Sequence, residues 1–272
     1  MDNNMTAQVV EKVVTLTPAE NSAIMAIAIA VAAGSLIWAL FELGWRRSPL
    51  LLLCLIGSLL SNPIEVFWDV LGHLRHHAGT PEAFTMFTDL AVPVRYPAWA
   101  FLIYMGFSGV ACFTFYRMLE RGATKKTFIT AMFGQAAMNI ILEGYIITFA
   151  YDYYGYQPWR FFGDFPVWWV LANYGELFGA ALILTLVRKY GPSAQWSAIL
   201  IVPGSFAAWE MWAGWPMYWA LNANFDWLAI NAAAFATAAI GIVTIWMIGR
   251  EMVPDWTADR RPLRKQSDTA PA

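Results

Sequence analysis

The chain has 272 residues, of which 59% are hydrophobic and only 13% are charged. A soluble domain carries about 25% charged residues to cover its surface, so this composition excludes an ordinary soluble enzyme and indicates a membrane protein with short loops. The formal net charge of −2 gives no electrostatic case for a nucleic-acid partner. The first twenty residues include Asp2, Glu11, Lys12 and Glu20, which is the wrong charge for a secretory signal peptide.

Seven apolar stretches are each long enough for a membrane span, since a bilayer core needs about 20 apolar residues per helix. They run over residues 21–43, 48–71, 96–116, 127–150, 166–187, 194–221 and 227–248. The sixth is interrupted by Pro203 and Pro216, which predicts a tilt or a kink. The expected fold is all-α: a polytopic membrane bundle of seven transmembrane helices. The expected parts are an N-terminal segment (1–20), the membrane domain (21–250) and a disordered tail (251–272).

The distribution of Lys and Arg predicts the orientation of the bundle. Thirteen of the 17 basic residues follow the first, third and fifth predicted helices or lie at the C-terminal end. Because basic residues favour the cytoplasmic side, the N-terminus is expected outside and the C-terminus in the cytoplasm. The protein is therefore expected to be a multi-pass protein of the cell inner (plasma) membrane, with segment 1–20 extracytoplasmic and tail 251–272 cytoplasmic.

Acidic side chains fall inside the predicted helices, where ionisable groups are costly and usually face the bundle interior. The second helix carries Glu65 and Asp69, the fourth Glu143 and the sixth Glu210. These helices run outward, so a rise of 1.5 Å per residue places Glu65, Glu143 and Glu210 about 25 Å from the cytoplasmic edge. Lys and Arg are absent from this depth. The pattern predicts an outward-facing cavity that contains at least one carboxylic acid and one carboxylate.

Further polar and aromatic side chains are expected to line this cavity, under a lid formed by the tyrosine-rich loop 151–160. The candidate substrate-binding residues are Asn62, Trp68, Asn139, Tyr154, Trp159, Trp168, Trp169, Glu176 and Trp209. Two structural explanations remain open: polar contacts between helices, and an ordinary aromatic belt at the membrane interface.

The three histidines lie together, at His73, His76 and His77. Their pattern imitates one histidine box of the membrane di-iron enzymes, but those enzymes need more histidines than this chain has. His73 continues the helical stripe of Asp69 at a spacing of four, where the two side chains could chelate a single ion with a second carboxylate. No metal and no cofactor are nevertheless predicted, and the ATP, dinucleotide and serine-hydrolase motifs are absent.

Several short motifs follow one another along the chain between the second and the sixth predicted helix. They are Pro63-x-Glu65-x-x-x-Asp69-x-x-Gly72-His73, then Phe84, Phe87 and Pro93, Arg117 in a cytoplasmic turn, Glu143, Tyr154-Gly155-x-Gln157-Pro158 and Pro166-x-Trp168-Trp169. Together they resemble the membrane spirocyclase family typified by avermectin spirocyclase (AveC-type). The resemblance implies cyclisation of a hydroxylated ketone to a spiroketal, sometimes with dehydration.

Such chemistry suits the predicted cavity, because a carboxylic acid can protonate a hemiketal hydroxyl while a carboxylate and aromatic faces stabilise the oxocarbenium ion. The candidate catalytic residues are Glu65, Asp69, Glu143, Glu210 and His73, without a distinction between acid and base. The expected partners are a hydrophobic polyketide- or lipid-like substrate and the lipid bilayer. The oligomeric state is left open.

Three alternatives compete with a spirocyclase. An integral-membrane terpene cyclase would also use intramembrane acids and aromatic side chains. A proton-coupled transporter for an apolar solute would need polar groups that continue to the cytoplasmic side. Gln135, Asn139 and Ser58 reach only part of the way, and the carboxylates of the inner half are limited to Glu42. The third alternative is an accessory subunit of a membrane complex.

Overall fold

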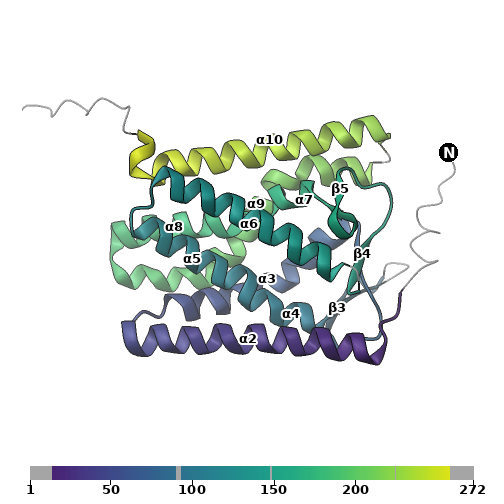
Figure 1. Cartoon of the computed structure of the whole chain (residues 1–272), viewed down its shortest axis with the longest axis horizontal. Coiled ribbons are helices and arrows are strands. Elements are labelled where there is room, and N and C mark those ends of the chain that lie inside the picture. The colour runs from purple at the N-terminus through teal and green to yellow at the C-terminus, as the bar shows by residue number, and fades with distance from the viewer. Residues whose placement is uncertain (1–13, 90–92, 148, 224, 258–272) are drawn as a thin grey trace, which may run out of the picture.

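The computed structural model describes residues 14–89, 93–147, 149–223 and 225–257 (Figure 1). Residues 1–13 of the expected N-terminal segment and residues 258–272 of the expected tail lie outside this description. The described residues are mostly helical, at 76%. In the described part, five helical segments are long and apolar enough to cross a membrane: Pro18–Arg46, Leu50–Leu71, Ala98–Glu120, Trp168–Tyr190 and Trp227–Met252. The protein is thus built as a multi-pass membrane bundle.

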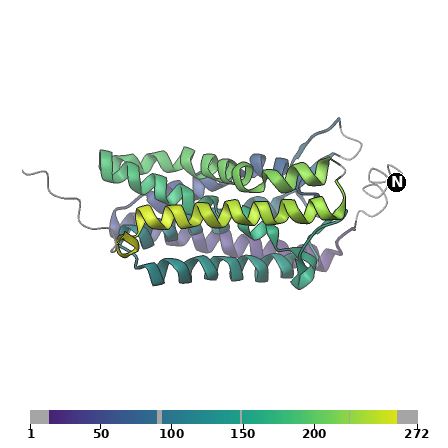
Figure 2. The ribbon, with the colours of Figure 1, turned by 90° about the horizontal axis from the view of Figure 1, so that it is seen from above.

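In the described part of the chain, the helices form seven rods. The rods run side by side in alternating directions (Figures 1 and 2). Five are single helices: α2 (Pro18–Arg46), α3 (Leu50–Leu71), α6 (Lys125–Ile146), α9 (Ala198–Asn222) and α10 (Trp227–Met252). The third rod consists of α4 (Ala98–Tyr104), the π-helix η1 (Met105–Gly109) and α5 (Val110–Glu120). The fifth consists of α7 (Trp168–Ala172) and α8 (Gly175–Tyr190). Each rod coincides with one of the seven predicted stretches to within a few residues.

The two helices outside the group of five apolar spans are α6 and α9. Both are as long as the others, with 22 and 25 residues. Their composition is less apolar, because α6 contains Gln135, Asn139 and Glu143, and α9 contains Glu210 and two prolines. These are the polar residues from which the sequence predicts an internal cavity.

Local side-chain caps explain where several helices begin. Thr17 and Glu20 form a reciprocal capping box at the start of α2, with Thr17 N donating to Glu20 Oε2 over 2.8 Å. The Thr124 hydroxyl accepts from Thr127 N at the start of α6, and Asp226 accepts from Ala229 N at the start of α10. Each cap satisfies a backbone N–H that the first helical turn leaves without a partner.

Three two-stranded antiparallel sheets add to the predicted all-α bundle. β1 (Leu74–His76) pairs with β4 (Tyr151–Tyr153), β2 (Glu82–Met86) with β3 (Val94–Pro97), and β5 (Arg160–Phe161) with β6 (Phe165–Pro166). The labelled strands β3, β4 and β5 lie at the end of the bundle where α2 begins (Figure 1), which we call the sheet end. Short 3₁₀ turns complete the fold as η2 (Phe162–Asp164), η3 (Pro192–Ser197) and η4 (Pro254–Thr257).

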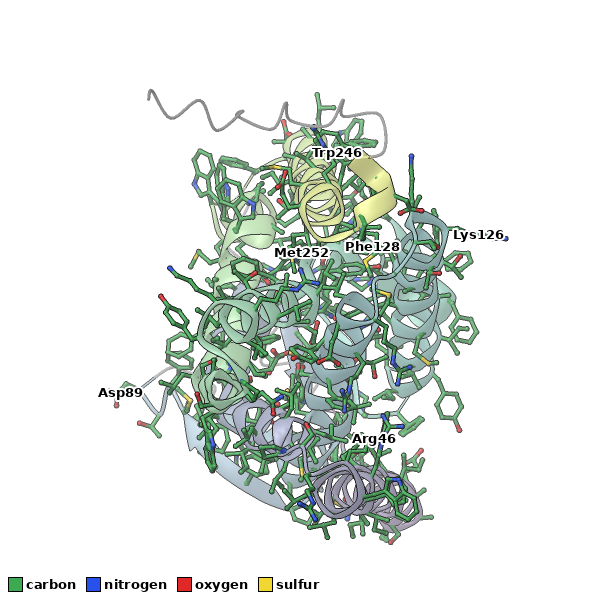
Figure 3. The ribbon with its side chains drawn as sticks, turned by 90° about the vertical axis from the view of Figure 1, so that its left-hand side faces the viewer. Arg46, Asp89, Lys126, Phe128, Trp246 and Met252 are labelled. Carbon is green, nitrogen blue, oxygen red and sulfur yellow. The ribbon has the colours of Figure 1, made fainter. Side chains whose placement is uncertain are left out.

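Helix α3 is densely packed, whereas α6 lies at an edge of the bundle (Figure 2). α3 packs against α2, α4, α5 and α9, and 13 of its 22 residues are buried. α6 buries only four of its 22 residues. At the end opposite the sheets, Phe128 of α6 points between α6 and α10 beside Met252, while Lys126 points away from the bundle (Figure 3).

Candidate active site

A cavity of about 60 Å³ lies at the sheet end between α3, α4 and α6. Three carboxyl side chains line it: Glu65 and Asp69 from α3, and Glu143 from α6. The rest of its wall is mainly aromatic and apolar, formed by Leu74, His76, Tyr96, Trp99, Ala100, Ile103, Tyr104, Ile146, Tyr151, Tyr153, Trp169 and Asn173. This described wall contains no Lys or Arg, so three acidic groups share a small space without a cationic neighbour in the wall.

The two acids of α3 lie one turn apart on the same helix face, which a spacing of four residues produces. Both are buried, with 7% of Glu65 and 1% of Asp69 exposed. The hydroxyl of Tyr104 hydrogen-bonds to the Glu65 carboxyl. Asp69 Oδ2 lies 3.1 Å from His76 Nε2. Each acid of α3 is therefore held by a specific polar partner.

His76 is fixed between aromatic rings. It meets Tyr96, Trp99 and Tyr151 edge-to-face at centroid distances of 5.5, 5.7 and 6.0 Å. Its backbone is fixed as well, because β1 pairs His76 with Tyr151 of β4. Because Nε2 contacts Asp69 and three aromatic rings hold the imidazole in place, the ring is positioned for proton exchange with Asp69.

Several buried polar atoms of the cavity wall have no hydrogen-bond partner among the described residues. They are the hydroxyls of Tyr151 and Tyr153, Trp99 Nε1 and His76 Nδ1. Most buried polar side-chain atoms in proteins have a partner, because leaving one unpaired costs about 1–3 kcal/mol. Four such atoms around one cavity indicate a site that hydrogen-bonds to an occupant.

A second cavity, of about 480 Å³, shares part of its wall with the first. Its lining consists of Ile147, Asp152, Tyr153, Arg160, Gly163 and Asp164. Tyr153 belongs to both walls, so its side chain separates the two spaces. We call the larger space the vestibule. Its volume lies in the range of about 300–1,000 Å³ that is usual for ligand pockets, and its lining is charged.

The predicted lid, loop 151–160, covers the acidic cavity and is firmly attached. Its strand β4 pairs with β1, and Tyr154 N donates to the His73 carbonyl over 2.9 Å. Gln157 is buried and donates through Nε2 to the Gly72 carbonyl over 2.9 Å. Gln157 Oε1 in turn accepts from Trp168 Nε1 over 3.0 Å. The loop is therefore a hydrogen-bonded cover that links α3 to α7.

The structure brings together three of the five predicted catalytic residues, Glu65, Asp69 and Glu143, in one cavity wall. Glu210 lies close enough to Glu65 and Asp69 for Coulomb interaction but is not part of that wall. Its Oε2 accepts a hydrogen bond of 2.5 Å from the Tyr218 hydroxyl.

His73 does not pair with Asp69 as its spacing predicts. Helix α3 ends at Leu71, and His73 turns into the left-handed backbone region with a φ of 60°. Its ring stacks on Tyr154 with a centroid distance of 4.7 Å, and burial lowers its pKa below the usual value of 6.5. The prediction was wrong because the helical spacing was extended beyond the end of the helix. His76 occupies the place beside Asp69 instead.

Among the predicted binding residues, Trp169 lines the acidic cavity. Asn62 supports a residue of the wall, whereas Trp68 and Trp209 contact residues outside the wall. Asn62 Oδ1 accepts from the Tyr96 hydroxyl over 2.9 Å. Trp68 stacks on Tyr218 at 5.6 Å. Trp209 donates to the Leu171 carbonyl over 3.1 Å.

The remaining predicted residues lie elsewhere. Trp159 packs edge-on against Phe235, outside the acidic cavity. Glu176 accepts from the Ser108 hydroxyl over 2.8 Å at the contact between α8 and η1. Asn139 is buried on α6 and lies one turn from Glu143, with no hydrogen-bond partner for either side-chain polar atom among the described residues.

Sequence reasoning missed His76 and the hydroxyl groups of the cavity wall. Tyr151 and Tyr153 alternate with Asp152, which is the two-residue period of a strand and could have identified β4. The pairing of Tyr151 with His76 joins residues that are 75 positions apart, and no local pattern reports such a contact.

In the described part of the chain, no group of three or more His, Cys, Asp or Glu side chains is placed to hold a metal ion. Comparison with protein-family models, curated proteins and solved structures found no match to this chain. Its function is therefore argued from the site.

Proposed function

We propose that the protein is a membrane-embedded acid–base catalyst that closes a ring on a hydrophobic polyketide- or lipid-like substrate with loss of water. The observation that carries this proposal is the aromatic cavity in which Glu65, Asp69 and Glu143 meet without a cation in its wall. An enclosed site of this kind can present a proton donor and a proton acceptor to one substrate. The resemblance to AveC-type spirocyclases supports a spiroketal-like product.

The reaction starts from a ketone whose chain carries two hydroxyl groups. One hydroxyl adds to the carbonyl carbon and gives a hemiketal. A carboxylic acid then protonates the hemiketal hydroxyl, the C–O bond breaks, and water leaves. The second hydroxyl forms a new C–O bond with the oxocarbenium carbon and gives its proton to a base. One proton is donated by the acid and one is accepted by the base, and one water is released. Transfer of a proton from the base back to the acid, through water, then regenerates the catalyst.

We assign the acid to Glu143 and the base to the Asp69–His76 pair. His76 has Nε2 on Asp69, while its Nδ1 is buried without a partner among the described residues. A carboxylate that orients an imidazole in this way is the arrangement used for general-base catalysis. Glu143 comes from α6, on another side of the same cavity, and so faces the reacting carbon from a different direction. The rings of Trp99 and Trp169 supply aromatic faces for the cation.

We further propose that all seven rods cross the cell inner (plasma) membrane, with the sheet end outside and the C-terminus in the cytoplasm. At 1.5 Å per residue, α6 and α9 measure about 33 and 38 Å, enough for a hydrocarbon core of about 30 Å. The alternating directions of the rods support this orientation, because they gather most of the basic residues at the end opposite the sheets.

Metabolite analysis tests the proposed function. Lipid-soluble compounds from a gene-deletion strain are compared by mass spectrometry after complementation with wild type, Asp69→Asn or Glu82→Gln. Glu82 is a matched control because its carboxylate is exposed at the surface, in an ion pair with Arg95. We expect the deletion and the Asp69→Asn strain to accumulate a precursor one water heavier than the missing product.

Two other outcomes would overturn this proposal. A precursor and a product of equal mass would replace dehydration by the terpene-cyclase type of ring closure. A compound that only moves between cells and medium would replace catalysis by transport.

A further inference from the structure

Helix α6 is fastened near both of its ends. At the sheet end, Gly144 lies against η2, where a Cβ on Gly144 would come within 2.4 Å of the Phe162 carbonyl oxygen. At the opposite end, Lys125 N donates to Asp255 Oδ1 over 2.7 Å, and the Tyr174 hydroxyl donates to the Met132 carbonyl over 2.7 Å. The helix is therefore anchored at Lys125–Met132 and again at Gly144.

The stretch between these anchors is poorly packed. Within the described part of α6, Asn139 is the only buried residue between Met132 and Gly144. α6 packs chiefly against the short segments η2, α7, β6 and η4, and not along a long helix of the described chain. A helix held at two ends with a loosely packed middle can move aside without unfolding.

Asn139 is the exception in this stretch, and it is unusual. Its side chain is only 1% exposed, yet neither Oδ1 nor Nδ2 has a hydrogen-bond partner among the described residues. It lies one helical turn before Glu143, a rise of about 6 Å along α6. A buried amide without a partner is unfavourable in a resting protein and is useful where a ligand supplies the missing partner.

The two openings of the acidic cavity have different chemistry. On the α4 and α6 side, the wall residues Ile103, Tyr104 and Glu143 are half-buried, whereas Asp69 of α3 is fully buried. This side lies next to the π-helix η1, which directly follows α4, and local π-helices often occur at functional sites. The vestibule side is lined by Asp152 and charged neighbours, which suit water better than an apolar chain.

We infer that a bilayer-dissolved amphiphile enters the acidic cavity laterally, between α6 and the α4–η1 segment, and that Asn139 binds one of its oxygen atoms. The oxygen atom bound by Asn139 lies about 6 Å along α6 from the reacting substrate carbon, which lies at Glu143. The apolar part of the molecule stays between the helices, and released water leaves past Tyr153 into the vestibule. That Glu143 meets the reacting carbon rests on the proposed function, whereas the lateral portal and the amide contact do not.

The small size of the acidic cavity supports this route. At about 60 Å³, the cavity is far smaller than the about 300–1,000 Å³ that is usual for ligand pockets. A lipid-like substrate therefore needs one wall to move. Of the two helices that supply carboxyl groups, α6 is the one with the loosely packed middle.

Spin-label accessibility tests the portal without any activity assay. Single nitroxides are placed by Ile103→Cys and Ile140→Cys in bilayer-reconstituted protein, after replacement of the buried Cys54 and Cys112 by Ala. Ile141→Cys is the lipid-facing control, since 59% of Ile141 is exposed, and Asp164→Cys at the vestibule is the water-facing control. We expect the labels at 103 and 140 to collide with dissolved oxygen, as at 141, and not with a water-soluble nickel chelate. Labels reached by neither reagent, or mainly by the nickel chelate, would overturn the portal.

Substitution of Asn139 tests the binding role. We expect Asn139→Leu to raise the melting temperature of the purified protein by a few degrees, because it removes an unpaired buried amide. The same variant should lower product formation in cells about tenfold, the effect of one lost hydrogen bond. Ala137→Leu, on the exposed side of α6, is the control and should change neither.

A lower melting temperature for Asn139→Leu would show that the amide is structurally paired and would overturn its binding role. If the spin labels report the portal and Asn139→Leu is stabilised, but no metabolite in the deletion strain differs by one water, the proposed reaction fails while the portal stands.

Discussion

Helices α3 and α6 supply the carboxyl groups of one cavity, yet they are packed in opposite ways. Both have 22 residues, of which 13 are buried in α3 and only four in α6. α3 touches α9 so closely that a Cβ on Gly57 would lie 2.8 Å from the Ala198 carbonyl oxygen. The corresponding Cβ on Gly134 of α6 would meet nothing within 4 Å. One acidic wall is densely packed, and the other is loosely packed.

This difference separates two requirements of a membrane-embedded catalyst. A catalytic group has to be held within a fraction of an ångström, which dense packing and specific partners provide. A large substrate also has to enter, which needs a wall with little packing to lose. Asp69 and His76 meet the first requirement on the densely packed side, and the middle of α6 meets the second.

The largest effect is expected at the densely packed wall, from His76→Gln. The amide nitrogen of Gln can keep a hydrogen bond to Asp69 but cannot accept and release a proton, so product formation should fall by about 10²–10⁴-fold. His77→Gln is the matched control, because His77 Nδ1 contacts the Phe149 carbonyl and His77 is not in the cavity wall. Metabolite mass spectrometry measures both variants. Full activity of His76→Gln would remove His76 from the mechanism.

The anchor of α6 can be broken at Gly163. This residue has a φ of 66°, and a Cβ on it would lie 2.0 Å from the Gly144 carbonyl oxygen. Gly163→Val adds a left-handed backbone cost of about 1–2 kcal/mol and an overpacking cost of about 1–3 kcal/mol. We expect a melting temperature lower by several degrees in detergent. An unchanged melting temperature would mean that α6 is not held by this contact.

A Gly→Ala substitution in each of the two helices measures how differently α3 and α6 are packed. Gly57→Ala should destabilise the protein by about 1–3 kcal/mol, because α3 has no space for the methyl group. Gly134→Ala should stabilise it by about 0.5–1 kcal/mol, because alanine loses less backbone entropy in a helix. Thermal melting of the pair measures the difference. Equal shifts would show that the two helices are packed alike.

The smallest effect is expected from pH, at His73 beyond the end of α3. Burial lowers the folded-state pKa of His73 below its usual 6.5, so the unfolded chain binds a proton first as the pH falls. The stability that the neutral His73 ring contributes to the folded state is therefore fully present above about pH 6.5 and is lost as the pH falls below that value. His73→Asn keeps a residue type that tolerates positive φ but does not titrate. Its melting temperature should fall less than that of wild type between pH 7 and pH 5, and an identical fall would contradict this role.

The sequence alone predicted where the helical rods lie in the chain and that Glu65, Asp69 and Glu143 come together. Both predictions succeeded for the same reason. Both depend on local periodicity: long apolar stretches give the helices, and a spacing of four residues places Glu65 and Asp69 on one face. The count of basic residues supplied the expected direction of each rod, and this aligned Glu143 with the acids of α3.

The sequence failed where the periodic pattern ends. Gly72 ends α3, so the spacing that links Asp69 to His73 no longer reports which side chain lies beside it. The strands are two to five residues long, too short for a reliable two-residue period. The contact of His76 with Tyr151 depends on strand pairing across the chain, which is a tertiary property.

The loose packing of α6 was also beyond sequence reasoning. Its polar stripe of Gln135, Asn139 and Glu143 predicts an inward face, but not whether another helix covers that face. Asn139 is buried and its side chain has no hydrogen-bond partner among the described residues, while the neighbouring wall residues Ile103 and Tyr104 are half-buried. Whether another helix covers the polar face of α6 depends on how the other rods are arranged.

Carboxyl groups of both walls, Asp69 from α3 and Glu143 from α6, are proposed to act on one substrate. A double-mutant comparison tests this proposal, with product formation measured for Asp69→Asn, Glu143→Gln and the double variant in membranes of equal protein content. We expect a loss of about 10²-fold or more for each single variant and no further large loss for the double variant, because the two groups serve one reaction. Losses that multiply, or a single variant with full activity, would contradict it.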